Sequence, residues 1–301
     1  MSLPIREGAY HIMLDLHTHS VMSDGTLRPA ELIEEAVRAG LTAIALTDHD
    51  SIAGLEEFLA AAAGHPELCA IPGIEFSCCL EKGDHCHMVG LFVDGGCPRL
   101  REACEQYVRW RDERNAEMVR RLNGMGYALT LEEVLACRSV PGVVGRPHIA
   151  AALVERGYVR TQREAFDTLI GRGRPAYVPR FVLPARECLD TIHAAGGLAI
   201  WAHPMTRDNM TVAKCERIIL ELAQHRLDGI EAHYSEHSPT QVRNVLTLAR
   251  KHGLLVSGGS DFHGQNRPGI RLGVGYGGLH VPDALLDEMR KESTKYASHT
   301  N

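Results

Sequence analysis

Short apolar runs alternate with amphipathic segments along most of this chain. The apolar runs, which predict seven buried strands, lie near residues 12–16, 42–47, 69–76, 86–93, 198–202, 228–232 and 254–258. Between most of them lie segments with apolar residues at helical spacing, such as 29–39, where Pro29 suits the first turn and Gly40 the end of a helix. Strands that alternate with helices are typical of a parallel sheet. We therefore expect an α/β fold, a distorted (β/α)7 barrel.

The alternation is interrupted once, after Gly95-Gly96-Cys97-Pro98. Beyond this point Leu100, Cys104 and Tyr107 begin a helical spacing that continues through a long charged segment, and shorter helical patterns follow to about residue 171. We expect residues 98–178 to form a helical insertion that acts as a substrate lid. Residues 1–97 and 179–301 would then form the barrel domain.

Polar residues able to bind metal stand at or beside the ends of six strand-like runs. They include His17, His19, Asp48, His49, Glu75, His87, His203, Asp261 and His263. His17 and His19 are two residues apart, so in an extended chain their rings point to the same side. Asp24 follows in a turn-like Ser-Asp-Gly-Thr segment. Because a barrel gathers its strand ends on one face, we expect these groups to converge on a metal site.

Composition limits the class of protein. With 301 residues, 45% hydrophobic and 23% charged, the chain has the proportions of a globular protein with a large core. The nine cysteines form no CxxC pair, as expected for reduced thiols in the cytoplasm. The sequence shows neither a signal-peptide pattern nor an apolar run long enough for a membrane span. A net charge of −6 argues against binding long nucleic-acid duplexes.

Positive charge is concentrated in one part of the chain. From Arg99 to Arg180 there are 15 Arg, no Lys and 10 acidic residues, so this segment carries +5 and the remainder −11. One interpretation is that these charges keep the exposed faces of the helices solvated. Alternatively, the insertion attracts a phosphate-bearing ligand, since the planar guanidinium group pairs with two phosphate oxygens at once.

Six motifs in this order resemble the polymerase-and-histidinol-phosphatase (PHP) superfamily of metal-dependent phosphoesterases. They are Asp15-Leu16-His17-Thr18-His19-Ser20, Thr47-Asp48-His49-Asp50, Gly73-Ile74-Glu75-Phe76-Ser77, His87-Met88-Val89-Gly90, Ala202-His203-Pro204 and Ser260-Asp261-Phe262-His263. The resemblance implies a distorted seven-stranded barrel with two to three divalent metal ions. Within the superfamily, the chain is most similar to the nucleotide phosphatases and RNA-end exonucleases.

The resemblance also implies an allocation of ligands. His17, His19, Glu75 and Asp261 would hold the first metal; Glu75, His87 and His203 the second; Asp24, His49 and His263 the third. His85 is an alternative to His87, which we favour because it precedes the family's Met-Val-Gly. Six imidazoles and three carboxylates suit Mn, Fe or Zn better than Mg. A metal-bound hydroxide would then be the nucleophile.

The insertion supplies the candidate substrate residues. Gly145-Arg146-Pro147-His148 stands at a helix start, where backbone N–H groups favour an anion. This run also resembles the nucleotide phosphoesterases of the superfamily, so we expect Arg146 to clamp phosphate and His148 to be a phosphate ligand or general acid. Arg174 occupies a position where relatives often carry Lys. We further expect Asp48 to orient a His ligand and Asp50 to cap the next helix.

These observations favour hydrolysis of a phosphomonoester on a small nucleotide: a nucleoside monophosphate, a 3′,5′-bisphosphate or the 5′ end of a short RNA. Histidinol-phosphate phosphatase is an alternative, although members of that branch usually place His near position 24. An amidohydrolase acting on C–N bonds is another, because those enzymes also carry His-x-His on a first barrel strand. A non-catalytic module is disfavoured by the full set of nine ligand candidates.

Overall fold

The computed structural model describes residues 13–137, 144–207 and 209–297. Its strands are β1 (Leu14–Asp15), β2 (Ala43–Leu46), β3 (Cys69–Cys79), β4 (His85–Leu91), β5 (Leu183–Pro184), β6 (Leu198–Trp201), β7 (Gly229–Tyr234) and β8 (Leu255–Gly259). Its helices are α1 (Pro29–Ala39), α2 (Leu55–Ala62), α3 (Pro98–Gly124), α4 (Leu131–Ala136), α5 (Arg146–Glu155), α6 (Gln162–Ala165), α7 (Ala185–Ala194), α8 (Val212–Ala223), α9 (Pro239–His252) and α10 (Ala284–Ala297). A π-turn at Phe166–Ile170 follows α6, and a 3₁₀ turn spans Gly264–Asn266. Among the described helices, none is long and apolar enough to cross a membrane.

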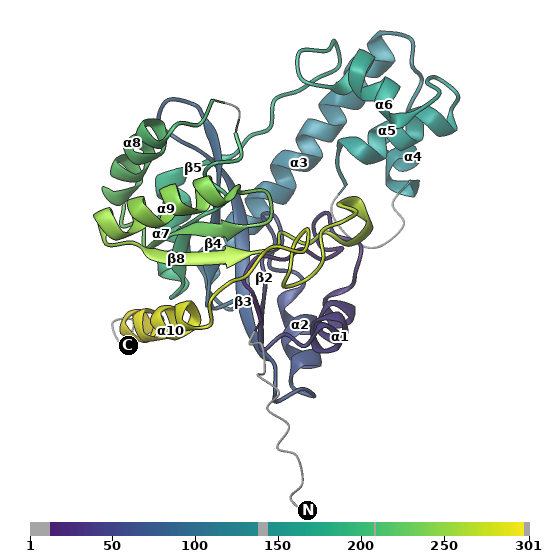
Figure 1. The fold of residues 1–301 in the computed structure, drawn as a ribbon. Helices are drawn as coiled ribbons and strands as arrows, with labels where there is room; N and C mark the ends of the chain where they lie inside the picture. Colours follow the sequence, from purple (N-terminus) through teal and green to yellow (C-terminus); the bar gives the residue numbers. More distant parts are fainter. Residues whose placement is uncertain (1–12, 138–143, 208, 298–301) are drawn as a thin grey trace, which may run out of the picture.

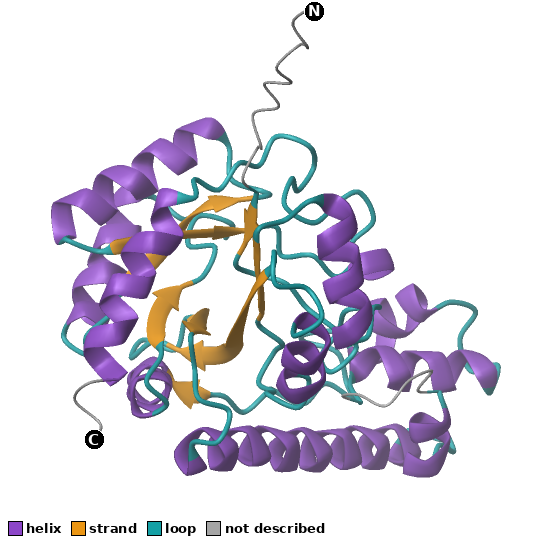
Figure 2. Ribbon diagram, turned by 90° about the horizontal axis from the view of Figure 1, so that it is seen from below, coloured by secondary structure: helices purple, strands orange, loops and turns teal. Residues whose placement is uncertain are grey.

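The strands form one curved sheet in the order β1-β2-β3-β4-β6-β7-β8, with β5 added beside β3. Figure 2 shows this sheet curling round on itself with helices outside. Its two edges meet where the backbone N–H of Leu16, just after β1, donates to the carbonyl of Gly258 in β8 at 3.2 Å. The predicted distorted barrel of seven strands is therefore confirmed.

One strand runs against the expected direction. β4 is antiparallel to both β3 and β6, whereas the other neighbouring pairs on the barrel path are parallel. The expectation of a wholly parallel sheet was wrong here, because only residues 80–84 separate β3 from β4. A connection this short allows a hairpin but no crossover helix.

Helix α1 follows its sequence signals closely. It begins with Pro29 at its first position, buries Leu32, Ile33 and Ala36, and ends at Gly40 in the left-handed conformation with φ 77°. Helix α2 differs from the expectation, since it begins at Leu55 after Gly54. Asp50 is thus four residues upstream of the N-cap, and its expected capping role was wrong.

The helices between β4 and β5 gather beside the barrel (Figure 1). The first half of α3 buries Leu100, Cys104 and Tyr107 in the core between the sheet and its helices. Its second half joins α4, α5 and α6 around a separate apolar cluster that includes Leu122, Val134 and Leu153. Helix α3 therefore contributes side chains to both the barrel core and the smaller core.

Candidate metal centre

The site lies where several strands end. β1 finishes at Asp15, whose buried carboxylate accepts hydrogen bonds from the backbone N–H groups of Ser260 and Gly273 at 2.7 and 2.8 Å. Burial raises the pKa of this carboxyl group to about 6 against the effect of those bonds. These contacts fix the segment after β1 against the segment after β8. His17 and His19 consequently face the residues that follow β8.

Glu75, in β3, stands at the centre of the first two groups of predicted ligands. Its Oε2 lies 3.2 Å from Nε2 of His17 and 3.3 Å from Nε2 of His19. Its Oε1 lies 2.9 Å from Nδ1 of His87 and 3.0 Å from Nε2 of His203. The two carboxylate oxygens thus face different sets of imidazoles, the arrangement needed for one carboxylate to bridge two cations.

Asp261 completes the first group. Its Oδ1 lies 3.1 Å from Nε2 of His19 and 3.7 Å from Nε2 of His17. The other oxygen accepts a hydrogen bond from the hydroxyl of Tyr234 at 2.7 Å and also pairs with Arg267. Asp261 therefore presents one oxygen to the histidines and is held in place through the other.

The third predicted group gathers around Asp24. Oδ1 of Asp24 lies 3.1 Å from Nε2 of His263, and Oδ2 lies 3.9 Å from Nε2 of His49. The opposite nitrogen of His49 is 2.9 Å from Oε2 of Glu75, so this ring lies between the groups. His19 also belongs with Asp24, His49 and His263 in a set whose potential ligand atoms all lie within 4.8 Å. The structure brings all nine predicted ligands together; His85 is exposed at the start of β4.

The donor atoms fit a divalent metal. Four buried atoms at this centre lack a hydrogen-bond partner of good geometry among the described residues: Nε2 of His17, Nε2 of His19, Nδ1 of His49 and Oε2 of Glu75. Unpartnered buried polar atoms are costly in a folded protein, and here they converge. A cation coordinated between them would remove that cost.

The charges of the centre are strongly coupled. Burial lowers the pKa of His17, but the negative charges of Glu75, Glu231 and Asp261 outweigh it and hold that pKa well above its ordinary value. Burial likewise raises the pKa of Glu75, but His49, His17 and His87 outweigh it and hold that pKa well below its usual range. The centre therefore keeps an ionised carboxylate in a buried place.

Two carboxylates outside the predicted ligand set support the centre, and one of them, Glu231, was not predicted from the sequence. Glu231, buried in β7, accepts hydrogen bonds from Nδ1 of His17 at 3.0 Å and from the backbone N–H of His203 at 2.7 Å. The available signal was an acidic residue between the apolar residues Ile230 and Ala232 of a strand-like run. Asp48, which was expected to orient a His ring, accepts hydrogen bonds from the hydroxyls of Ser20 and Ser23 at 2.6 and 2.5 Å, and the Ser23 hydroxyl lies 3.4 Å from Nδ1 of His19. Asp48 thus fixes the loop that carries His19 and Asp24.

A cavity of about 690 Å³ leads from Asp24 and His49 toward α3 and α5. The predicted substrate residues Arg146 and His148 line it, and so do Arg111, Arg114 and Arg180. Burial, followed by the charge of Arg146, lowers the pKa of Arg114 to about 10. Cations crowded this closely favour an anionic ligand. Arg174 is exposed and outside this lining, so its substrate role stays a prediction without structural support.

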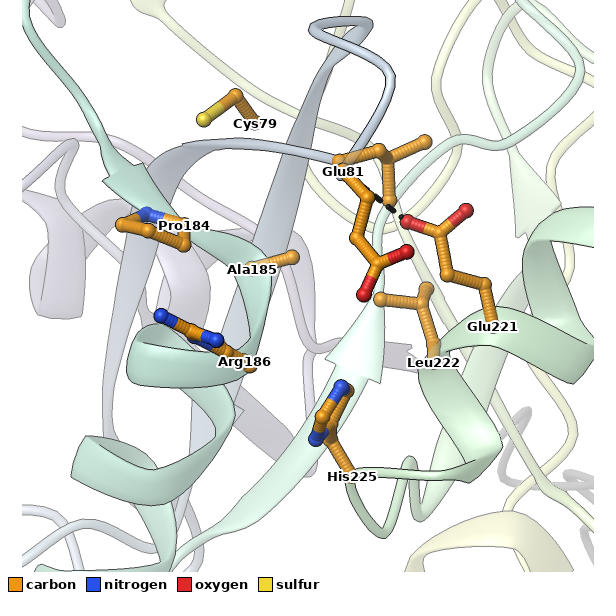
Figure 3. Close-up of a pocket in the computed structure, with 9 residues that line it drawn as sticks. Cys79, Glu81, Pro184, Ala185, Arg186, Glu221, Leu222 and His225 are labelled. Atoms are coloured by element: carbon orange, nitrogen blue, oxygen red, sulfur yellow. Dashed lines mark hydrogen bonds between the residues drawn. The ribbon is translucent and has the colours of Figure 1, made fainter.

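A second cavity, of about 310 Å³, lies on another part of the barrel (Figure 3). It is lined by Leu80, Pro184, Ala185 and Leu222 together with several polar residues, and the backbone N–H of Glu81 donates to Glu221 across it. None of the nine predicted ligands is among its described lining residues. We therefore assign the candidate active site to the larger, arginine-lined cavity.

Comparison with known proteins agrees with this geometry. The PHP domain model matches residues 15–154. The 5′-3′ exoribonuclease Rnm of Salmonella typhimurium is 34% identical, over 91% of this chain and 92% of its own. The 3′,5′-nucleoside bisphosphate phosphatase of Chromobacterium violaceum is 35% identical, over 86% of this chain and 90% of its own. A crystal structure from Bifidobacterium adolescentis, described as a metal-dependent phosphoesterase, is 30% identical, covers 92% of this chain and 94% of its own, and has a TM-score of 0.75.

Proposed function

Because the chain belongs to the PHP family and is a metal-dependent phosphoesterase, we propose that it hydrolyses a phosphomonoester of a nucleotide. The substrate is a nucleoside monophosphate, a 3′,5′-bisphosphate or the 5′ end of a short RNA. The observation that carries this proposal is the cavity that joins the His and carboxylate centre to a wall of four arginines. One relative is named as a bisphosphate phosphatase and another as an exoribonuclease, and both names support a substrate built from nucleotides.

The nine residues of the centre would hold two to three divalent metal ions. Imidazole and carboxylate ligands without thiolate favour Mn, Fe or Zn over Mg. When bound, such metals activate water and neutralise charge on the phosphoryl oxygens. Glu75 would be shared between metals, since its two oxygens face different histidines.

The arginines bind and orient the substrate. The guanidinium group of Arg146 lies 5.5 Å from the centroid of the Phe166 ring and 5.8 Å from that of Tyr177, which hold it at the start of α5. Arg114 donates through Nε to the carbonyl of Val178 at 2.9 Å, and burial together with the nearby charge of Arg146 lowers its pKa to about 10. A phosphate bound here would neutralise these charges.

His148 is suited to binding a phosphate oxygen of the substrate. Its Nδ1 accepts a hydrogen bond from the backbone N–H of Gly145 at 3.1 Å. The neutral ring therefore carries its proton on Nε2. In this proposal the Nε2–H group donates a hydrogen bond to a phosphate oxygen of the substrate and keeps its proton; action as a general acid would require the ring to be protonated on both nitrogens, and the Gly145 hydrogen bond would then be lost.

We also place the enzyme in the reducing cytoplasm. The structure describes every cysteine of the chain as a free thiol, including Cys78 and Cys86, whose sulfurs are 3.2 Å apart. Free thiols in such numbers are typical of cytosolic proteins.

Phosphate release from a panel of substrates tests the function. The panel contains nucleoside monophosphates, 3′,5′-bisphosphates, 5′-phosphorylated short RNAs and histidinol phosphate, each assayed with Mn and with Zn. We expect turnover of the nucleotides and its loss, by about 1,000-fold or more, in Glu75→Gln, because the shared ligand is gone. Glu56→Gln, on an exposed part of α2, should retain wild-type activity. Preference for histidinol phosphate, or turnover of amides without any phosphate release, would contradict the proposal.

A further inference from the structure

An aromatic pair stands on the arginine-lined wall of the larger cavity. Trp110, in α3, and Phe181, just before β5, both line this cavity, and their ring centroids are 5.7 Å apart with planes 31° from parallel. Phe181 remains 70% exposed although it is a large apolar side chain. Its ring thus packs against Trp110 while much of its surface stays open.

Other aromatic side chains support Trp110 and connect the pair to the barrel sheet. Trp110 packs edge-on against Tyr107, at 5.7 Å between centroids, and Tyr107 stacks on Phe76 of β3 at the same distance. The Tyr107 hydroxyl also accepts a hydrogen bond from the backbone N–H of Leu183 at 3.1 Å. A continuous column of rings therefore runs from the barrel sheet to Phe181, which is its open end.

Asp50 connects the aromatic pair to the metal centre through two ion pairs. This fully buried carboxylate follows His49 directly and pairs with Arg111, at 3.3 Å, and with Arg180. Arg111 and Arg180 are the chain neighbours of Trp110 and Phe181. One carboxylate next to a predicted metal ligand thus fixes both arginines and, through the backbone, both rings.

We propose that Phe181, supported by Trp110, is the nucleobase subsite, on which the base of the substrate stacks while its phosphate lies at the metal centre. This inference rests on the proposed function, and it names the part of the substrate that the aromatic pair recognises. An exposed aromatic face beside cationic side chains is the usual platform for a base on a charged backbone. Since every base has a π-face, the subsite tolerates different bases but discriminates against a substrate that has none.

The test compares two substrates in four proteins. The substrates are adenosine 3′,5′-bisphosphate and 1-deoxyribose 3,5-bisphosphate, which carries the same phosphates without a base. The proteins are the wild type, Phe181→Ala, Phe181→Tyr and, as a matched control, Tyr276→Ala, which removes another exposed ring (60% exposed) from outside the cavity lining.

We expect Phe181→Ala to lower kcat/KM for the nucleotide by about tenfold, the effect typical of losing one base stack, and to leave the baseless substrate unchanged. Phe181→Tyr should restore the wild-type value, and Tyr276→Ala should match the wild type on both substrates. An equal loss on both substrates, or no loss on either, would overturn the subsite. If the wild type hydrolyses neither substrate nor any other nucleotide, the proposed function itself has failed.

Tryptophan fluorescence gives a readout that needs no turnover. Stacking of adenosine 5′-monophosphate on the pair should quench the emission of Trp110, whereas ribose 5-phosphate should not. The quench should disappear in Trp110→Phe, which leaves the buried Trp201 as the sole tryptophan, excited selectively at wavelengths that tyrosine does not absorb. A quench that persists in Trp110→Phe would place the base elsewhere and overturn the inference.

Discussion

Among single residues, Glu231 shows how a metal centre depends on side chains outside the ligand set. It fixes the ring of His17 and the backbone of His203, which belong to two different predicted metal groups. We expect Glu231→Gln to weaken metal binding by about 10- to 100-fold, since the amide accepts a weaker hydrogen bond from Nδ1 of His17. Competition with a fluorescent chelator measures this affinity, with Glu56→Gln as the control. Unchanged affinity would show that the ligands are positioned without Glu231.

At the scale of elements, Asp50 joins β2, β3, α3 and the segment before β5. It accepts a hydrogen bond from the backbone N–H of Ser77 at 2.7 Å as well as pairing with Arg111 and Arg180. Its φ of 52° lies in the left-handed region, which Asn tolerates, so Asp50→Asn removes the charge without straining the backbone.

We expect Asp50→Asn to lower the free energy of unfolding by about 3 kcal/mol, because the mostly buried Arg111 loses its counter-charge. Denaturant unfolding measures the change. Asp190→Asn, which breaks an exposed pair with Arg99, should change stability by less than about 1 kcal/mol. Equal effects of the two substitutions would mean that the buried ion cluster adds little to stability.

The insertion helices give a second prediction at this scale. Leu153 of α5 is completely buried in the smaller core, whereas Leu135 of α4 is 49% exposed. Leu153→Ala should cost about 3 kcal/mol and raise amide hydrogen exchange mainly in α4, α5 and α6, because the cavity it leaves is confined to that core. Leu135→Ala should have little effect. Exchange that rises equally in the barrel would show that the two cores unfold together.

For the whole molecule, the predicted ligands extend from His17 to His263, so metal binding links both ends of the sheet. Any ligand that binds only the folded state stabilises it. We expect chelation to lower the melting temperature by about 5–10 °C and to abolish phosphate release, and both should return when Mn or Zn is added. Differential scanning fluorimetry detects the shift, and Glu75→Gln should be insensitive to chelator. A wild type equally insensitive to chelator would contradict a metal-filled centre.

The sequence alone was sufficient wherever the controlling physics is local. The spacing of Leu32, Ile33 and Ala36, with Pro29 and Gly40 at the ends, determines α1 because helical periodicity and end signals act over a few residues. Polar residues that follow apolar runs marked the strand ends of the barrel. Since parallel strands of a barrel end on one face, His17, Glu75 and Asp261 were expected together before any distance was known.

Only the tertiary structure decided which groups face one another across the fold. The role of Glu231 depends on β7 lying near His17. Arg111 and Arg180 lie 69 residues apart in the chain and meet on Asp50. Sequence patterns report the environment of a residue through its near neighbours. They do not report contacts that form only when distant segments pack, and such contacts assemble the arginine wall and its aromatic pair.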